Sequence, residues 1–121
     1  MGKTEKKANR KDQEIEYEVS SGNVFKDFNY PNPEEAKAKS DIAALIRGYI
    51  KKNGLTQEVA AIMMGIDQPK VSKITRGVLH EFTLEWMMNC LLGLGFDVEI
   101  KAKESEKPSP SIHFIPALAF A

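Results

Sequence analysis

Residues 55–77 constrain the fold more than any other part of the chain, because two short helix patterns follow one another there across a single turn. The first helix is predicted over residues 57–64, and Gly65 ends it where the turn needs a positive φ angle. The second helix is predicted over residues 68–75, with Asp67 as its N-cap. Two short helices joined by a tight turn predict a helix-turn-helix unit, a motif whose second helix enters the DNA major groove.

Two longer helical patterns flank this unit. The first is predicted to run from Pro33 to about Lys52, and its buried stripe is expected to be Ile42, Leu45, Ile46, Tyr49 and Ile50. The other is predicted over residues 84–92, with Thr83 as its cap and with Gly93 and Gly95 after it. Within the helix-turn-helix unit, the residues expected to face the core are Val59, Ile62, Ile66, Val71 and Ile74.

Two short segments alternate between apolar and polar residues, so strands are predicted at 14–19 and 96–101. The expected fold class is therefore mainly α: a helix-turn-helix domain with a short C-terminal β-strand and a possible N-terminal strand. The chain divides into a disordered basic arm at 1–13, a strand and apolar docking segment at 14–32, a DNA-binding and dimerisation domain at 33–102, and a flexible tail at 103–121.

The second helix of the predicted unit turns polar and basic residues outward once Val71 and Ile74 point inward. Such side chains suit DNA, since Gln can pair with adenine, Lys with guanine and Ser with either base. The backbone N–H groups at the start of the first helix suit a phosphate. The candidate DNA-binding residues are Thr56, Gln57, Gln68, Pro69, Lys70, Ser72, Lys73 and Arg76.

The charge distribution supports this interpretation only locally. The chain holds 17 basic and 17 acidic residues, so its net charge gives no sign of a nucleic-acid partner. Residues 41–80, however, hold six basic and three acidic residues. We expect Lys70, Lys73 and Arg76 to bind phosphates, and Gln68, Ser72 and Lys73 to contact bases. The alternative is an ordinary solvated helix face.

The helix predicted at 84–92 is apolar on more than one side, which suggests a surface for a second copy of the chain. The strand predicted at 96–101 also needs a partner, either its symmetry mate or the strand at 14–19. A homodimer would place two recognition helices about 34 Å apart on a palindromic operator in double-stranded DNA. The candidate dimer residues are Trp86, Cys90, Leu94, Phe96, Val98 and Ile100.

Several function classes are not expected. His80, His113 and Cys90 lack the spacing of metal ligands, so we expect no metal and no cofactor. We expect no enzymatic activity, because no activated nucleophile or phosphate-binding glycine loop is recognisable. No apolar run is long enough for a membrane helix and no secretory signal is visible, so the expected location is the cytoplasm.

The helix-turn-helix segment resembles the Cro and lambda-repressor type, often called the XRE family. Counting from Gln57, that family's pattern has glutamine first, alanine fifth, glycine ninth, a β-branched residue fifteenth and an aliphatic residue eighteenth. This chain has Gln57, Ala61, Gly65, Val71 and Ile74 at those positions. The resemblance implies a lambda-repressor-like helical domain that binds DNA.

A closer resemblance covers about residues 20–101 and points to the HigA-type antitoxins of bacterial toxin–antitoxin systems. It is carried by the sequences at 21–27, 54–57, 66–72, 82–84 and 95–100. The resemblance implies a dimer, in the bacterial cytoplasm at the nucleoid, that represses its own operon and neutralises a RelE/HigB-like ribonuclease toxin. The strand and apolar patch at 15–30 are one candidate docking element for the toxin; the alternative is that they cover the domain's own core. Two alternatives remain: a stand-alone phage-type or metabolic repressor without a toxin, and a protein-interaction module that has lost DNA binding.

Overall fold

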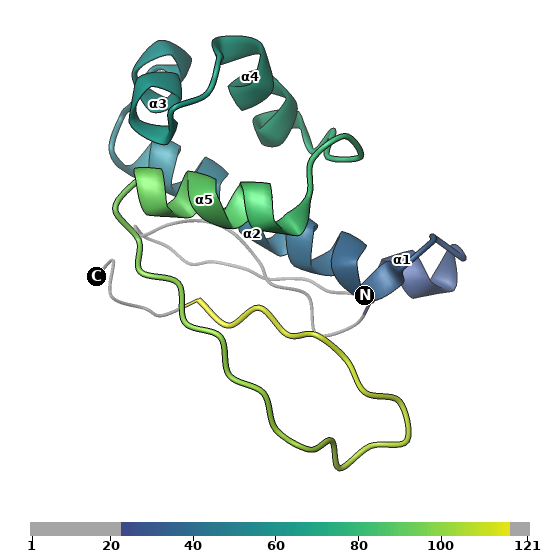
Figure 1. Cartoon of the computed structure of the whole chain (residues 1–121). Helices are drawn as coiled ribbons and strands as arrows, with labels where there is room; N and C mark the ends of the chain where they lie inside the picture. Colours follow the sequence, from purple (N-terminus) through teal and green to yellow (C-terminus); the bar gives the residue numbers. More distant parts are fainter. Residues whose placement is uncertain (1–22, 117–121) are drawn as a thin grey trace.

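The computed structural model describes residues 23–116, and five helices are found in that part of the chain (Figure 1). The helices are α1 (Val24–Asp27), α2 (Pro33–Lys52), α3 (Gln57–Met64), α4 (Gln68–Arg76) and α5 (Leu84–Gly93). The four longer helices confirm the predicted helical pattern, with α4 and α5 each one residue longer than expected. The predicted basic arm at 1–13 and the predicted strand at 14–19 lie outside the described residues.

The first helix, α1, is a single turn within the segment predicted only as an apolar docking element. It forms because Oδ1 of Asn23 accepts hydrogen bonds from the backbone N–H groups of Phe25 and Lys26, at 3.1 and 3.4 Å. The amide nitrogen of Asn23 donates to the carbonyl of Pro33 at 3.0 Å, which ties α1 to the start of α2. Much of the apolar surface of this segment stays exposed, at Val24, Phe28 and Tyr30.

The hydrophobic core is built around α2, which packs against α1, α4 and α5, while α3 packs against α4 and α5. Its largest fully buried side chains come from α2, α4 and α5, and include Ile46, Ile74, Met87 and Leu91. The predicted stripe of α2 is confirmed, with three residues buried and two half-buried at its C-terminal end. This core holds the helix-turn-helix pair above α2 and α5 (Figure 1).

The expectation that Val59 and Ile62 face the core is wrong. Val59 is 43% exposed and Ile62 is 75% exposed. The side of α3 that packs inward is formed by Ala60, Ala61 and Met64. Two small alanines let this short helix approach the core closely, and the larger aliphatic side chains beside them are left on the solvent side.

The chain after α5 is extended but forms no strand within residues 23–116, so the predicted strand at 96–101 is not confirmed. Phe96 and Val98 pack against the core, whereas Ile100 is 81% exposed. The alternation of side chains is therefore present, but no second strand lies beside this segment in the described part of the chain. A strand requires a hydrogen-bonded neighbour as well as an alternating pattern.

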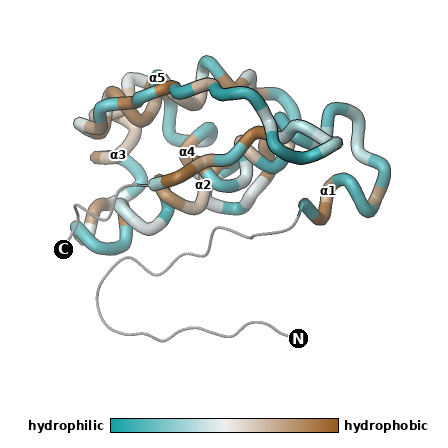
Figure 2. The backbone as a smooth tube through the Cα atoms, turned by 90° about the horizontal axis from the view of Figure 1, so that it is seen from below, coloured by the Kyte–Doolittle hydropathy of each residue, from teal (hydrophilic) through white to brown (hydrophobic). Residues whose placement is uncertain are grey.

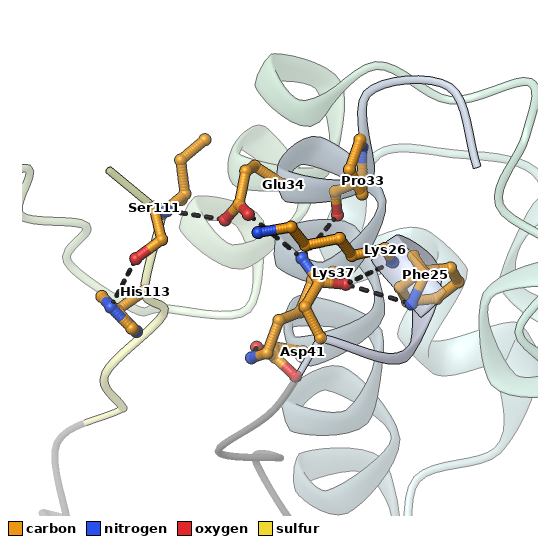
Figure 3. A network of polar contacts seen from close by, with 10 residues as sticks. Phe25, Lys26, Pro33, Glu34, Lys37, Asp41, Ser111 and His113 are labelled. Carbon is orange, nitrogen blue, oxygen red and sulfur yellow. Dashed lines mark hydrogen bonds and ion pairs between the residues drawn. The ribbon is translucent and has the colours of Figure 1, made fainter. Parts of the chain in front are cut away.

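The predicted C-terminal tail returns to the helices after a long exposed loop (Figure 1). The N–H of Ile112 donates to Oε1 of Glu34 in α2 at 2.9 Å, and Phe114 packs against the core. Figure 2 shows this hydrophobic segment passing over α2. The second carboxylate oxygen of Glu34 accepts a hydrogen bond from Asn23 at 3.3 Å, so one side chain links α1, α2 and the returning segment (Figure 3).

An ion pair is buried on α2. Nζ of Lys37 lies 2.7 Å from Oδ2 of Asp41, one helical turn away, and both residues are buried (Figure 3). Burial raises the pKa of the Asp41 carboxyl, although the hydrogen bond from Lys37 opposes that shift. Among the helices of the described residues, none has the length and hydropathy of a membrane-spanning segment.

Candidate nucleic-acid interface

The turn between α3 and α4 sets the orientation of the candidate site. Gly65 follows α3 with a φ of 72°, a left-handed conformation that glycine adopts without a Cβ clash. The N–H of Ile66 donates to the carbonyl of Ala61 at 3.0 Å and closes the helix end. Asp67 then caps α4, since its Oδ1 accepts a hydrogen bond from the N–H of Lys70 at 3.0 Å.

The helix after this turn, α4, has one buried and one open side. Val71 and Ile74 are fully buried in the core. The opposite side carries Gln68, Pro69, Ser72, Lys73 and Arg76, with Lys70 on its flank. Gln68, Pro69 and Arg76 are exposed, and Lys70, Ser72 and Lys73 are half-buried. The structure therefore brings these six predicted residues onto one polar surface that lies away from the core.

The two predicted residues at the start of α3 differ in how their side chains are used. The hydroxyl of Thr56 accepts a hydrogen bond from the N–H of Val59 at 3.0 Å and serves as the N-cap. Gln57 is the first helical residue and is half-buried. This helix start offers backbone N–H groups and a positive dipole end, which favour an anion such as a phosphate.

Two cations of α4 are already paired with carboxylates. Nζ of Lys70 lies 2.7 Å from Oδ2 of Asp67, and Nζ of Lys73 lies 2.7 Å from Oε1 of Glu81. The hydrogen bond from Lys70 lowers the pKa of Asp67 and raises the pKa of Lys70. The hydrogen bond from Lys73 lowers the pKa of Glu81. Asp67, Lys70 and Glu81 therefore stay charged near neutral pH.

The third cation, Arg76, is held within α4. Its Nε donates to the hydroxyl of Ser72 at 3.2 Å, one turn earlier in the helix. Its charge is not neutralised by this neutral partner. Three cations on this surface thus face the two carboxylates of Asp67 and Glu81, and one positive charge is left over.

Of the two carboxylates at this surface, Glu81 is the one that the sequence pattern does not reveal. Asp67 is recognisable as a helix cap, and its spacing of three residues from Lys70 is a usable signal for an ion pair. Glu81 lies eight residues after Lys73 and beyond the end of α4, so no helical periodicity relates the two residues.

The six residues predicted at a dimer interface fall into two groups in the structure, two in the core and four with accessible surface. Cys90 and Leu94 are only 2% and 3% exposed, so they belong to the core of the protomer and leave no surface for a second copy. The protomer therefore does not support the assignment of Cys90 and Leu94 to a dimer interface, because α2 and α3 both pack against α5. Burial also raises the pKa of the Cys90 thiol to about 11.

The other four of these residues retain accessible surface. Trp86 is half-buried and stacks on Phe82, with ring centroids 4.3 Å apart. Phe96 is half-buried and meets the ring of Tyr49 edge-on at 5.2 Å. Val98 is half-buried, and Ile100 projects from the extended segment.

The described residues hold no group of three His, Cys, Asp or Glu side chains that could bind a metal ion. His113 is exposed and pairs with the hydroxyl of Ser111 at 2.8 Å (Figure 3).

Comparisons with known proteins agree with this geometry. The helix-turn-helix domain family matches residues 24–103. A solved structure of a candidate XRE family transcriptional regulator matches with a TM-score of 0.68 and 32% sequence identity, covering 72% of this chain and 100% of that chain. Among curated proteins, none matches. The chain belongs to the helix-turn-helix domain family and, within it, to the XRE type.

Proposed function

We propose that this XRE-type helix-turn-helix protein is a sequence-specific repressor that reads its operator with α4. The observation that carries the proposal is the polar surface of α4, which presents Gln68, Ser72 and Lys73 together with the cations Arg76 and Lys70, while Val71 and Ile74 are buried on the other side. Occupancy of a promoter by this surface would block transcription. No catalytic step, metal or cofactor belongs to this proposal.

The residues of the surface take two kinds of role. Gln68, Ser72 and Lys73 contact base edges in the major groove, with Pro69 at the helix start beside them. Lys70 and Arg76 bind phosphates, and the N-terminus of α3 at Thr56 and Gln57 holds another phosphate through its backbone N–H groups. Phosphate contacts supply affinity that falls with salt, and base contacts supply specificity.

The repressor acts as a homodimer on a palindromic operator. Two copies would meet through the extended segment after α5, where Phe96, Val98 and Ile100 alternate, and through Trp86. No strand lies beside residues 97–101 within the described part of the chain, and an unpaired strand edge of this kind can pair with the same segment of a second copy.

We further propose an antitoxin role, in which the protein binds a RelE/HigB-like ribonuclease toxin in the bacterial cytoplasm. The resemblance to HigA-type antitoxins supports this role, and so does an exposed apolar surface at the start of the described chain. Val24, Phe28 and Tyr30 are at least half exposed, and Phe25 and Tyr30 meet edge-to-face at 4.8 Å. Such a surface suits a protein partner rather than DNA.

Two measurements test these roles separately. Selection of bound duplexes from a randomised pool, followed by footprinting at the chain's own promoter, tests the repressor. Co-expression with the protein encoded by the neighbouring gene, followed by a pull-down and a growth assay, tests the antitoxin. If the neighbour is toxic and this chain restores growth, the antitoxin role stands; if no complex forms, a stand-alone repressor remains. Failure to bind any duplex would favour a protein-interaction module.

A further inference from the structure

Lys73 in α4 is held by a carboxylate from outside that helix. Its Nζ lies 2.7 Å from Oε1 of Glu81, in the turn between α4 and α5. The two side chains are 36% and 37% exposed, so the ion pair lies at the protein surface and not in the core. Any base or phosphate that approaches the ammonium of Lys73 therefore also meets the negative charge of Glu81.

The two carboxylates beside α4 differ in what else they do. Asp67 is the N-cap of the helix, and its Oδ1 accepts the hydrogen bond from the N–H of Lys70. The side chain of Glu81 makes its one hydrogen bond within residues 23–116 to Lys73. Glu81 therefore caps no helix, and its contact with Lys73 requires a different explanation.

We propose that Glu81 is a positioning residue that raises the DNA specificity of α4, because it restrains the ammonium of Lys73 and repels phosphates. This inference rests on the DNA-reading role proposed for α4. In this role Glu81 raises the ratio of cognate to non-cognate affinity, although its carboxylate lowers the affinity for every duplex.

The chemistry of the ammonium group makes this possible. A lysine ammonium has three N–H donors, and Glu81 occupies one of them. The other donors can reach the O6 and N7 acceptors of a guanine while the ion pair is kept. A phosphate at the same place gains less, because the nearby carboxylate repels it. Glu81 therefore weakens binding to every sequence, and only the hydrogen bonds to the cognate base offset that loss of affinity.

The test compares wild type with Glu81→Gln on two duplexes of equal length. One is selected by the wild-type protein from a randomised pool, and the other has an unrelated sequence. Because Lys73 can then neutralise one more phosphate, the variant should bind the unrelated duplex about threefold more tightly, with a salt slope steeper by about 0.9 per protomer. Its affinity for the selected duplex should change less, so the ratio of the two affinities falls.

Three further variants make the interpretation specific. Glu104→Gln removes the same charge from an exposed site in the loop after α5 and should leave both affinities unchanged. Glu81→Asp keeps the charge and should keep the weak binding to the unrelated duplex. In a Lys73→Met background, Glu81→Gln should no longer steepen the salt slope, because no ammonium is released.

Each outcome decides the inference. Equal affinities and equal slopes for wild type and Glu81→Gln would overturn it. An equal loss of affinity for both duplexes would also overturn it, because that result indicates a structural role. So would a salt slope that Glu81→Gln still steepens in the Lys73→Met background. If the wild-type protein binds no duplex at all, the proposed function fails together with the inference; if it selects a sequence normally, only the role of Glu81 is in question.

Discussion

Gln68 is the residue of α4 whose role is easiest to separate from the others. It is exposed at the first position of the helix, and its amide makes no hydrogen bond within residues 23–116. Such an amide can donate and accept at the same time, as adenine N6 and N7 require. We expect Gln68→Ala to lose about 1–3 kcal/mol of discrimination at one base pair, measured by competition with single-base variants of the selected duplex.

Arg76→Gln provides the comparison for that experiment. Its guanidinium is exposed and bonded to a neutral hydroxyl, so it suits a phosphate. Its loss should weaken all duplexes alike and reduce the salt slope by about 1. If Gln68→Ala also weakens every duplex alike, the assignment of Gln68 to a base is wrong.

Cys90 reports on the integrity of the core. Burial raises its pKa to about 11, so at about pH 8 only about one thiol in a thousand is ionised. Because the thiolate is the reactive form, we expect a thiol-specific reagent to modify Cys90 very slowly in the native protein and rapidly in denaturant. Rapid native-state labelling would place this residue outside the core.

The buried pair of Lys37 and Asp41 should reveal itself in the free energy of unfolding. Removing one partner leaves a buried charge alone, so Asp41→Leu should cost about 3–5 kcal/mol. The double variant Lys37→Met with Asp41→Leu should be close to wild type, because no charge is then left without its partner. Urea unfolding measures both, and an equally large loss in the double variant would show that the charges do not interact.

At the scale of the helices, the bounds that were predictable are those set by local chemistry. Thr56, Asp67 and Thr83 each accept a backbone hydrogen bond within the next three residues, and such caps can be recognised from the sequence alone. The short α1 is different, because its cap also bonds to Pro33 in the next helix. The inward side of α3 was mispredicted for a related reason: alanines determine it, and hydrophobicity favours the larger residues beside them.

Gly65 and Gly93 both lie at helix ends, and the effects of alanine and asparagine on stability should rank in opposite orders at the two sites. A Cβ at Gly93 would lie 2.6 Å from the carbonyl oxygen of Met63 and 2.8 Å from Cα of Met64, so alanine there forces α5 away from α3. A Cβ at Gly65 would meet nothing within 4 Å, and only its positive φ is strained.

We therefore expect Gly93→Ala to cost about 1–3 kcal/mol and the larger Gly93→Asn to cost more. Gly65→Ala should cost about 1–2 kcal/mol, and Gly65→Asn should cost less than Gly65→Ala, because asparagine tolerates the left-handed region. Thermal unfolding of the four variants tests this order. The same ranking of Ala and Asn at both sites would contradict the distinction.

At the scale of the whole molecule, contacts between distant segments limit what the sequence can predict. The alternation at 96–101 is present in the structure, yet no strand forms in the described part, because a strand depends on a neighbour that the pattern does not specify. The pairing of Lys73 with Glu81 is likewise set by the path of the turn after α4. The helix-turn-helix surface was predictable, and the carboxylate of Glu81 that modifies its charge was not.

The proposed homodimer can be tested at Ile100, because Ile115 provides a matched control of the same residue type and similar exposure. Ile100 is 81% exposed in the proposed interface, and Ile115 is 84% exposed in the segment that returns to α2. Because neither side chain is buried in the protomer, lysine at either site should leave folding intact. Ile100→Lys should shift the protein to monomer in sedimentation equilibrium and weaken operator binding by about 10²–10⁴-fold, since two half-sites are then bound independently. Ile115→Lys should change neither, and an equal effect of both substitutions would remove 96–101 from the interface.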